Sequence, residues 1–167
     1  MVQNAEHRTG AVWCKANDAR VTPLGRILRK LHLDEFPQLF NVIKGEMSLV
    51  GPRPERPKFV EVLAKAIPGY RRRLAVAPGI TGLAQLNLPP DSDLDSVRRK
   101  LMLDIEYIEH AGLLLDMRLL AATLLRLTRV PSSWAFAILG VGRTVVLPPL
   151  DSRQGEQRRA LQKRAAA

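Results

Sequence analysis

The sequence predicts an α+β domain in which helices dominate and the β-sheet is small. Apolar residues recur at helical spacing in several segments, whereas only short stretches have the composition of a strand. The chain has 167 residues, 46% of them hydrophobic, which is enough for a single domain with its own core. We therefore expect one compact domain over residues 1–130. An extension over residues 131–167 follows, and we expect it to be partly disordered because its end is charged and alanine-rich.

The chain begins with a turn-rich stretch, residues 1–22, and the first predicted helix follows at residues 23–32. Leucine and isoleucine side chains lie at helical spacing on one side of this segment. Arg26, Arg29 and Lys30 lie on the other side. The predicted helix is therefore amphipathic and basic.

A second helix is predicted at residues 34–44. Asp34 fits its N-cap position, and Pro37 lies in the first turn, where the missing N–H costs little. Gly45 fits the position after the helix, where left-handed backbone is common. Residues 47–50 then have the composition of a short strand.

Two prolines enclose an arginine directly after this strand, in the sequence Gly51-Pro52-Arg53-Pro54. Proline fixes its own backbone and restricts the residue before it, so the backbone around Arg53 is stiff. A guanidinium on a stiff backbone can hold a phosphate through two hydrogen bonds with little entropy left to lose. An ordinary exposed loop arginine fits the residues equally well, and the sequence pattern alone leaves both interpretations open.

Further along, helices are predicted at residues 56–66, 95–110 and 112–129, and a short strand is predicted near residues 82–87. A polar linker before residue 95 supplies the start of the helix that follows it. After Pro131 the periodic pattern weakens. The second half of the domain is therefore predicted to be mainly helical.

Two short motifs precede the predicted strand at residues 82–87. The sequence YRRRL, residues 70–74, is a basic cluster, for which a solvated surface is the commoner outcome and contact with phosphates or anionic headgroups is the alternative. The sequence APGITG, residues 77–82, has no P-loop pattern and is best interpreted as a tight turn.

The segment at residues 112–129 has leucines on nearly all sides. A buried core helix is the favoured interpretation. The alternative is a helix that lies in a membrane interface, with Arg118, Arg126 and Arg129 extending to the headgroups.

The charge of the chain limits its partners. The formal net charge is +10 and the pI is about 10.6, so the chain should attract nucleic acid, anionic lipids or phosphorylated substrates.

A single cysteine excludes an internal disulfide framework, and no zinc-ligand spacing is present. No apolar run is long enough to be predicted as a membrane span.

Asp34 and Glu35 form an acidic pair within this basic chain. Carboxylates at a helix start often serve only as caps that favour the helix dipole. Adjacent carboxylates can also divide chemical roles, with one acting as a nucleophile or metal ligand and the other as a ligand or base. Because two acids would repel a phosphate substrate, this second interpretation requires a divalent cation, for which Mg²⁺ is the expected choice.

These motifs together resemble one known family. The sequences GRILRKLHLDEFPQLFNVIKGEMSLVGPRPE, PGITGLAQLN and LDIEYIEHAGLLLDMRLL closely resemble the catalytic domain of the bacterial sugar transferases, the monotopic polyprenyl-phosphate phosphoglycosyltransferases. The resemblance extends from about residue 1 to about residue 126. The acidic pair followed at this spacing by the proline-rich motif is long and specific.

The resemblance implies a reaction and roles for particular residues. Members of the family transfer a phospho-sugar from a UDP-sugar to undecaprenyl phosphate, releasing UMP, as the first step of exopolysaccharide, capsule or O-antigen synthesis. By resemblance, Asp34 is the nucleophile that forms a phosphosugar–aspartyl intermediate, and Glu35 assists with Mg²⁺, for which both are expected ligands. Arg53, with Arg26 and Arg29, is expected to bind the substrate phosphates. The supporting motif residues are Pro37, Gly51, Pro52 and Pro54.

The resemblance also implies a location, the cytoplasmic face of the bacterial inner membrane, where amphipathic helices rest on the membrane surface. Family members carry an N-terminal re-entrant membrane helix, and this sequence starts after the point where that segment ends. We therefore expect a truncated reading frame, a domain fragment, or one part of a split enzyme with a membrane-anchored partner segment. The family's Ser-Gly-Arg after the T-G-x-x-Q segment is replaced here by the sequence LNLPPDSD, which points to a changed sugar site.

Two other functions remain open on the sequence alone. A non-catalytic remnant, or half of a split enzyme, fits the absent membrane segment. A basic nucleic-acid-binding protein fits the charge alone and ranks lower, because the basic residues form no single stripe or recognition helix. We expect no nucleic-acid partner. The sequence does not identify the sugar.

Overall fold

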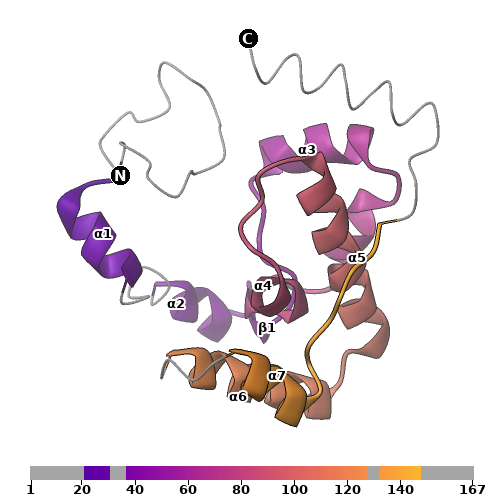
Figure 1. Cartoon of the computed structure of the whole chain (residues 1–167). Helices are drawn as coiled ribbons and strands as arrows, with labels where there is room; N and C mark the ends of the chain where they lie inside the picture. The colour runs from indigo at the N-terminus through magenta and orange to yellow at the C-terminus, as the bar shows by residue number, and fades with distance from the viewer. Residues whose placement is uncertain (1–20, 31–36, 128–131, 148–167) are drawn as a thin grey trace.

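In the computed structural model, helices surround a small parallel sheet (Figure 1). The structure describes residues 21–30, 37–127 and 132–147. The described strands are β1 (Ser48–Val50) and β2 (Gly79–Thr81). The described helices are α1 (Pro23–Lys30), α2 (Gln38–Ile43), α3 (Pro57–Ala66), the 3₁₀ helix η2 (Tyr70–Ala75), α4 (Leu83–Asn87), α5 (Leu94–His110), α6 (Leu113–Leu127) and α7 (Ser132–Leu139). This architecture confirms the predicted helix-dominated α+β class.

The sheet consists of β1 and β2, which pair in parallel with Ser48 opposite Gly79 and Val50 opposite Thr81. Parallel strands need a long crossover, and α3 and η2 lie in the crossover here. The strand predicted near residues 82–87 is wrong, because these residues form α4. Leu83, Ala84 and Leu86 are buried on one side of this helix, in a segment of good helix formers.

The structure describes the second predicted helix, residues 34–44, from residue 37 onward. Its described part, α2, begins at Gln38 with Pro37 at the N-cap position and no side-chain cap. Asp34, the predicted N-cap, lies outside the described residues. Gly45 has a φ of 78°, and its N–H lies 3.0 Å from the carbonyl oxygen of Val42, as predicted for the residue that ends this helix.

Helix α5 contributes to both hydrophobic clusters of the domain. Its Val97 and Leu101 pack with residues of α3 and η2. Its Leu103 and Tyr107 pack with residues of β1, α4 and α6. The start of α5 is fixed by a capping box, in which Asp93 Oδ1 accepts a hydrogen bond of 2.7 Å from the Ser96 N–H.

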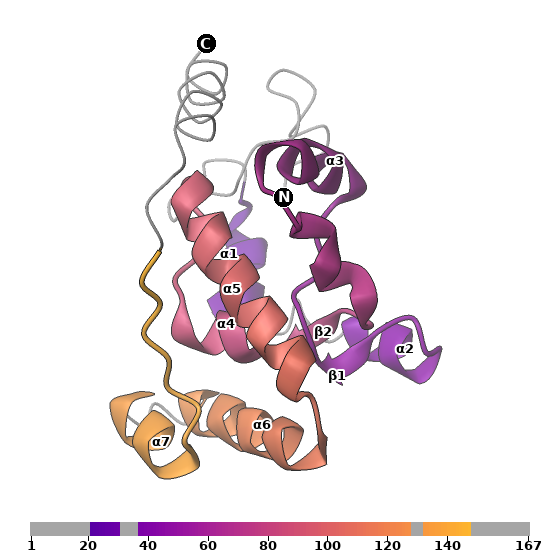
Figure 2. The ribbon, with the colours of Figure 1, turned by 90° about the vertical axis from the view of Figure 1, so that its right-hand side faces the viewer.

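Helices α6 and α7 lie side by side across one end of α5 (Figure 2). Leu119 and Ala122 of α6 and Val141, which follows α7, are completely buried in the same cluster. The sequence did not predict α7, because its residues are almost all apolar and give no helical period. The described part of the extension therefore packs onto the domain.

A membrane span requires a helix of sufficient length and hydropathy. Within the described ranges, none of the helices is both long enough and apolar enough to span a bilayer.

Candidate active site

The Gly51-Pro52-Arg53-Pro54 turn (the GPRP turn) leaves β1 beside β2. The Gly51 N–H donates a hydrogen bond of 2.9 Å to the carbonyl oxygen of Thr81. The Gly79 N–H donates one of 2.9 Å to the carbonyl oxygen of Pro52. The first half of the turn is therefore fixed to the neighbouring strand by its backbone.

Glycine is required where these two segments meet. A Cβ atom on Gly79 would lie 2.1 Å from the nitrogen of Gly51, and one on Gly82 would lie 2.3 Å from the carbonyl oxygen of Gly51. No side chain fits at these distances, because the neighbouring atoms belong to the backbone. The tight turn predicted at residues 77–82 is wrong: Gly79 begins β2, Gly82 follows it, and both allow close packing against the GPRP turn.

The two halves of the GPRP turn have different environments. Gly51 and Pro52 are buried, whereas Arg53 and Pro54 are exposed. The backbone of Arg53 is held, because its carbonyl oxygen accepts a hydrogen bond of 2.8 Å from Nη2 of Arg73. The turn thus presents the Arg53 side chain at the surface from a buried base.

Arg73 is a buried arginine. Its Nε donates a hydrogen bond of 2.8 Å to Oδ2 of Asp104, and both side chains are only 2% exposed. Its Nη1 lies 3.2 Å from the Tyr70 hydroxyl oxygen, and its guanidinium carbon lies 5.4 Å from the centre of the Tyr70 ring. Arg73 therefore directs its guanidinium to groups inside the protein.

The basic cluster at residues 70–74 is consequently divided. Arg71 pairs with Glu61, and Arg72 pairs with Glu109, at exposed positions. The expectation of a solvated surface is right for these two arginines and wrong for Arg73. A 3₁₀ helix has three residues per turn, so Arg73 lies on the same side as the buried Tyr70.

Burial changes the ionisation of this group. Removal from water raises the pKa of Asp104 to about 6, against the opposing attraction of Arg73. Burial likewise raises the pKa of the Tyr70 phenol to about 12. At neutral pH the pair is therefore mainly ionic and Tyr70 is neutral.

The acidic pair Asp34 and Glu35 lies outside the described residues, as does the side chain of Arg29. Pro37, two residues after Glu35, begins the described chain at α2. Helix α2 contacts β1, and the carbonyl oxygen of Asn41 accepts hydrogen bonds of 2.9 and 3.2 Å from the N–H groups of Glu46 and Met47. The chain that follows the acidic pair is therefore joined to the strand that leads into the GPRP turn.

The predicted phosphate-binding arginines do not all come together. Arg26 is exposed on α1, which lies at the left of Figure 1, away from β1. Arg53 lies directly after β1. Among the described side chains of the predicted phosphate-binding arginines, that of Arg53 lies at the GPRP turn.

A comparison with protein-family models decides the family. The model for bacterial sugar transferases matches residues 1–129, which include the acidic pair, the GPRP turn and α5. The chain belongs to the bacterial sugar transferase family. The resemblance found in the sequence motifs is thereby confirmed.

Curated sugar transferases show how this domain relates to complete proteins. The chain is 44% identical over 124 residues to a UDP-N-acetylgalactosamine-undecaprenyl-phosphate N-acetylgalactosaminephosphotransferase of Aeromonas hydrophila, covering 74% of this chain and 29% of that protein. It is 45% identical over 114 residues to an undecaprenyl-phosphate glucose phosphotransferase of Komagataeibacter xylinus, covering 65% and 21%. The chain thus spans less than a third of the length of these two relatives.

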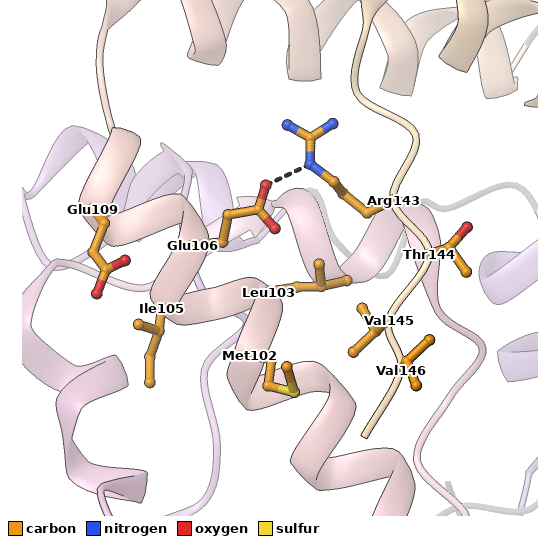
Figure 3. Close-up of a pocket in the computed structure, with 9 residues that line it drawn as sticks. All are labelled: Met102, Leu103, Ile105, Glu106, Glu109, Arg143, Thr144, Val145 and Val146. Atoms are coloured by element: carbon orange, nitrogen blue, oxygen red, sulfur yellow. Dashed lines mark hydrogen bonds and ion pairs between the residues drawn. The ribbon is translucent and has the colours of Figure 1, made fainter. Parts of the chain in front are cut away.

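The sugar transferase domain also has a groove between α5 and residues 143–146 (Figure 3). Its volume is about 510 Å³, and its wall is mostly apolar apart from Glu106, Glu109, Arg143 and Thr144. Glu106 and Arg143 form an ion pair in it. Because no residue of the predicted site lines this groove, we do not assign the transferase site to it.

Sequence reasoning missed the buried pair of Arg73 and Asp104 beneath the GPRP turn. Arg73 looked like one of three equivalent surface arginines. A signal was present at Asp104, which continues the buried helical series of Val97 and Leu101 at a position where an apolar residue is expected. A carboxylate at such a position needs a buried partner.

The donors of a metal site can also be compared with the prediction. Among the described residues, no group of three or more His, Cys, Asp or Glu side chains could hold a metal ion. The expected Mg²⁺ ligands, Asp34 and Glu35, lie outside that part of the chain, so they remain a prediction.

Proposed function

We propose that this domain transfers a phospho-sugar from a UDP-sugar to undecaprenyl phosphate and releases UMP. The observation that carries the proposal is the family match over residues 1–129, together with relatives whose names describe undecaprenyl-phosphate sugar phosphotransferases. The reaction would begin the synthesis of an exopolysaccharide, a capsule or an O-antigen.

The proposed reaction has two displacements at one phosphorus atom. In the first, a carboxylate oxygen of Asp34 bonds to the phosphorus that carries the sugar, and the bond from that phosphorus to UMP breaks. In the second, a phosphate oxygen of undecaprenyl phosphate bonds to the same phosphorus, and the Asp34 carboxylate leaves. The product is a lipid diphosphate sugar, and the enzyme returns to its starting state.

Arg53 is proposed to hold the diphosphate during both displacements. Its backbone is held by buried contacts while its side chain is exposed, so the guanidinium is presented on a fixed support. A guanidinium offers two parallel N–H donors to phosphate oxygens, which a lysine ammonium cannot reproduce. Arg26 and Arg29 remain proposed contributors to phosphate binding.

Asp34 and Glu35 are the proposed ligands of Mg²⁺. Carboxylate oxygens are the hard donors that this ion takes in proteins, so the chemistry of the predicted donor set fits the ion. When bound, the ion would neutralise phosphate charge that the two acids would otherwise repel. Asp34 would act as the nucleophile, and Glu35 would keep the substrate in position.

The acceptor lipid requires a membrane surface, which we propose to be the cytoplasmic face of the inner membrane. The surface of α6 supports this proposal, because Leu113 is 80% exposed and Leu114 66% exposed, beside the exposed Arg118. Arg126 is also exposed and hydrogen-bonds the carbonyl oxygen of Gln85 at 3.1 Å. Arg129, the third arginine predicted to extend to headgroups, lies outside the described residues.

The test is transfer by the purified chain in lipid nanodiscs that contain undecaprenyl phosphate and Mg²⁺. Radiolabelled UDP-glucose and UDP-N-acetylgalactosamine are supplied, because the relatives' names contain both sugars. We expect labelled lipid with the wild type and about 10³-fold less or none with Asp34→Ala or Glu35→Ala, as is usual when a nucleophile or its partner is lost.

Two results would contradict the proposal. Equal transfer by Asp34→Ala would refute the assignment of the nucleophile. Absence of transfer by folded wild-type protein would favour a non-catalytic remnant or half of a split enzyme. Adding the family's membrane segment as a separate peptide then separates those two, since only a split enzyme would regain transfer.

A further inference from the structure

One face of α5 contacts the segment from Val50 to Glu55 at three successive points. The first contact is at the start of the GPRP turn. The Tyr107 hydroxyl oxygen lies 3.2 Å from the carbonyl oxygen of Val50 and 2.9 Å from Oδ1 of Asp116 in α6. The hydroxyl thus joins α5 to the last residue of β1.

The second contact passes through Arg73. Asp104, which lies one turn before Tyr107 on α5, holds the guanidinium of Arg73 at 2.8 Å, and Arg73 holds the carbonyl oxygen of Arg53 at 2.8 Å. The contact therefore fixes the peptide group between Arg53 and Pro54.

The third contact lies after the turn. Lys100, a further turn towards the start of α5, donates a hydrogen bond of 2.6 Å to Glu55 and one of 2.7 Å to Asp91. All three of these side chains are largely buried, with relative exposures of 12 to 14%. The contact therefore fixes the chain just beyond Pro54.

The spacing of these residues places all three contacts on the same face of α5. Lys100, Asp104 and Tyr107 follow one another at i, i+4 and i+7, so they lie on one face of the helix. Their contacts run in the opposite order along the segment from Val50 to Glu55. We propose that these three residues, together with Arg73, are positioning residues that aim the Arg53 side chain at the substrate phosphates; this rests on the proposed function.

A purely stabilising role would not account for this arrangement. A buried ion pair such as Arg73–Asp104 often stabilises a fold no better than apolar side chains of similar volume. What apolar side chains cannot supply is the directed hydrogen bond to the Arg53 carbonyl. Backbone hydrogen bonds from Gly51 to Thr81 and from Gly79 to Pro52 fix the buried half of the turn, and α5, through Arg73, supports the exposed half.

The test replaces the ion pair without leaving a buried charge. The double variant Arg73→Met/Asp104→Leu keeps the volume but removes the hydrogen bond to Arg53. Since small misplacements of a binding group can reduce rates by about 10²-fold, we expect kcat/KM to fall by roughly 10-fold to 10²-fold, with Tm within a few degrees of the wild type. Arg71→Gln is the matched control and should leave both values unchanged.

The same double variant is then made in Arg53→Ala protein. If Arg73 acts through Arg53, the loss should shrink to less than about 3-fold, because residues that act together are not additive. An equal loss in both backgrounds would show a general structural effect and overturn the proposal. Unchanged activity in the wild-type background would overturn it as well.

A second measurement does not depend on activity. Hydrogen exchange of the Gly51 and Gly79 amides, which fix the GPRP turn to β2, should accelerate at least about 10-fold in the double variant, while exchange in α6 stays the same. Tyr107→Phe and Lys100→Gln serve as further variants if the double variant does not fold, and each should accelerate exchange in the same peptides. Unchanged exchange in folded variants would refute the positioning role, even if the wild type transfers no sugar.

Discussion

The GPRP turn and the outer face of α6 differ in the kind of side chain that each buries and exposes. The backbone of the turn accepts a hydrogen bond from Arg73 at Arg53, and Tyr107 bonds the carbonyl oxygen of Val50 just before the turn. The outer face of α6 is apolar, and its Leu113, Leu114, Met117 and Leu124 are exposed. Buried polar side chains thus support the GPRP turn, whereas the outer face of α6 leaves large apolar side chains at the surface.

The comparison shows that the available partners of a side chain decide whether it is buried. Whether the side chain is polar or apolar matters less. Arg73 is buried because Asp104 and two other acceptors satisfy its guanidinium. The exposed leucines of α6 need no hydrogen-bond partner. An apolar side chain at the surface only forgoes the free energy that its burial would contribute. Such a face, on a chain proposed to act on a lipid, is where we expect the membrane surface.

The largest change in stability is expected when the close contact between Gly79 and Gly51 is lost. In Gly79→Ala the added carbon would overlap the backbone of Gly51, so the strands must separate. We expect a loss of about 3 kcal/mol or more in the free energy of unfolding, measured by urea denaturation. Gly112→Ala, which has no neighbouring atom closer than 4.0 Å, is the control and should change stability little.

The next effect concerns the buried arginine. Arg73→Ala leaves the Asp104 carboxyl without its partner in the interior, and breaking a buried pair in this way typically costs about 3–5 kcal/mol. Arg71→Ala removes only an exposed ion pair with Glu61 and should change stability by less than about 1 kcal/mol. Similar values for the two variants in urea denaturation would contradict the buried position of Arg73.

The two sides of α6 offer a comparison within one helix. Leu119→Ala creates a cavity in the core and should cost about 2–5 kcal/mol. Leu114→Ala should change stability by less than about 0.5 kcal/mol. Its effect should appear instead as weaker cosedimentation with vesicles that contain anionic lipid; if Leu114→Ala leaves this binding unchanged, the outer face of α6 is not the membrane surface.

The smallest effect is expected at the start of α5. Asp93→Ala removes the N-cap of the helix that supports the GPRP turn, and such a loss costs about 1 kcal/mol. Thermal denaturation should show the change. Asp93→Ser, which can still accept the hydrogen bond from Ser96, should restore most of it.

Local patterns in the sequence predicted much of this fold. The helices α3 and α5 follow from apolar periodicity, α6 follows from its leucine-rich composition, and the end of α2 follows from Gly45. The position of β2 did not, because a strand of three residues depends on its partner β1 rather than on its own composition. The burial of Arg73 also depends on Asp104, which is 31 residues away in the sequence.

For the site, the motifs identified the acidic pair and Arg53, but not the residues that hold Arg53. Those residues come from α5 and η2, and only the folded chain brings them to the turn. Periodicity alone could have indicated Asp104, because a carboxylate at an apolar position of a helix must have a partner. The uniformly apolar α7 gave no such pattern.

The most direct test of the central claim is UMP release without the lipid acceptor. The chain is mixed rapidly with a UDP-sugar and Mg²⁺, and UMP is measured against time. A covalent intermediate on Asp34 predicts a burst of about one UMP per enzyme that then stops, and that is absent in Asp34→Ala. If wild-type protein that is active with undecaprenyl phosphate releases no UMP until that lipid is added, the two-displacement account is contradicted.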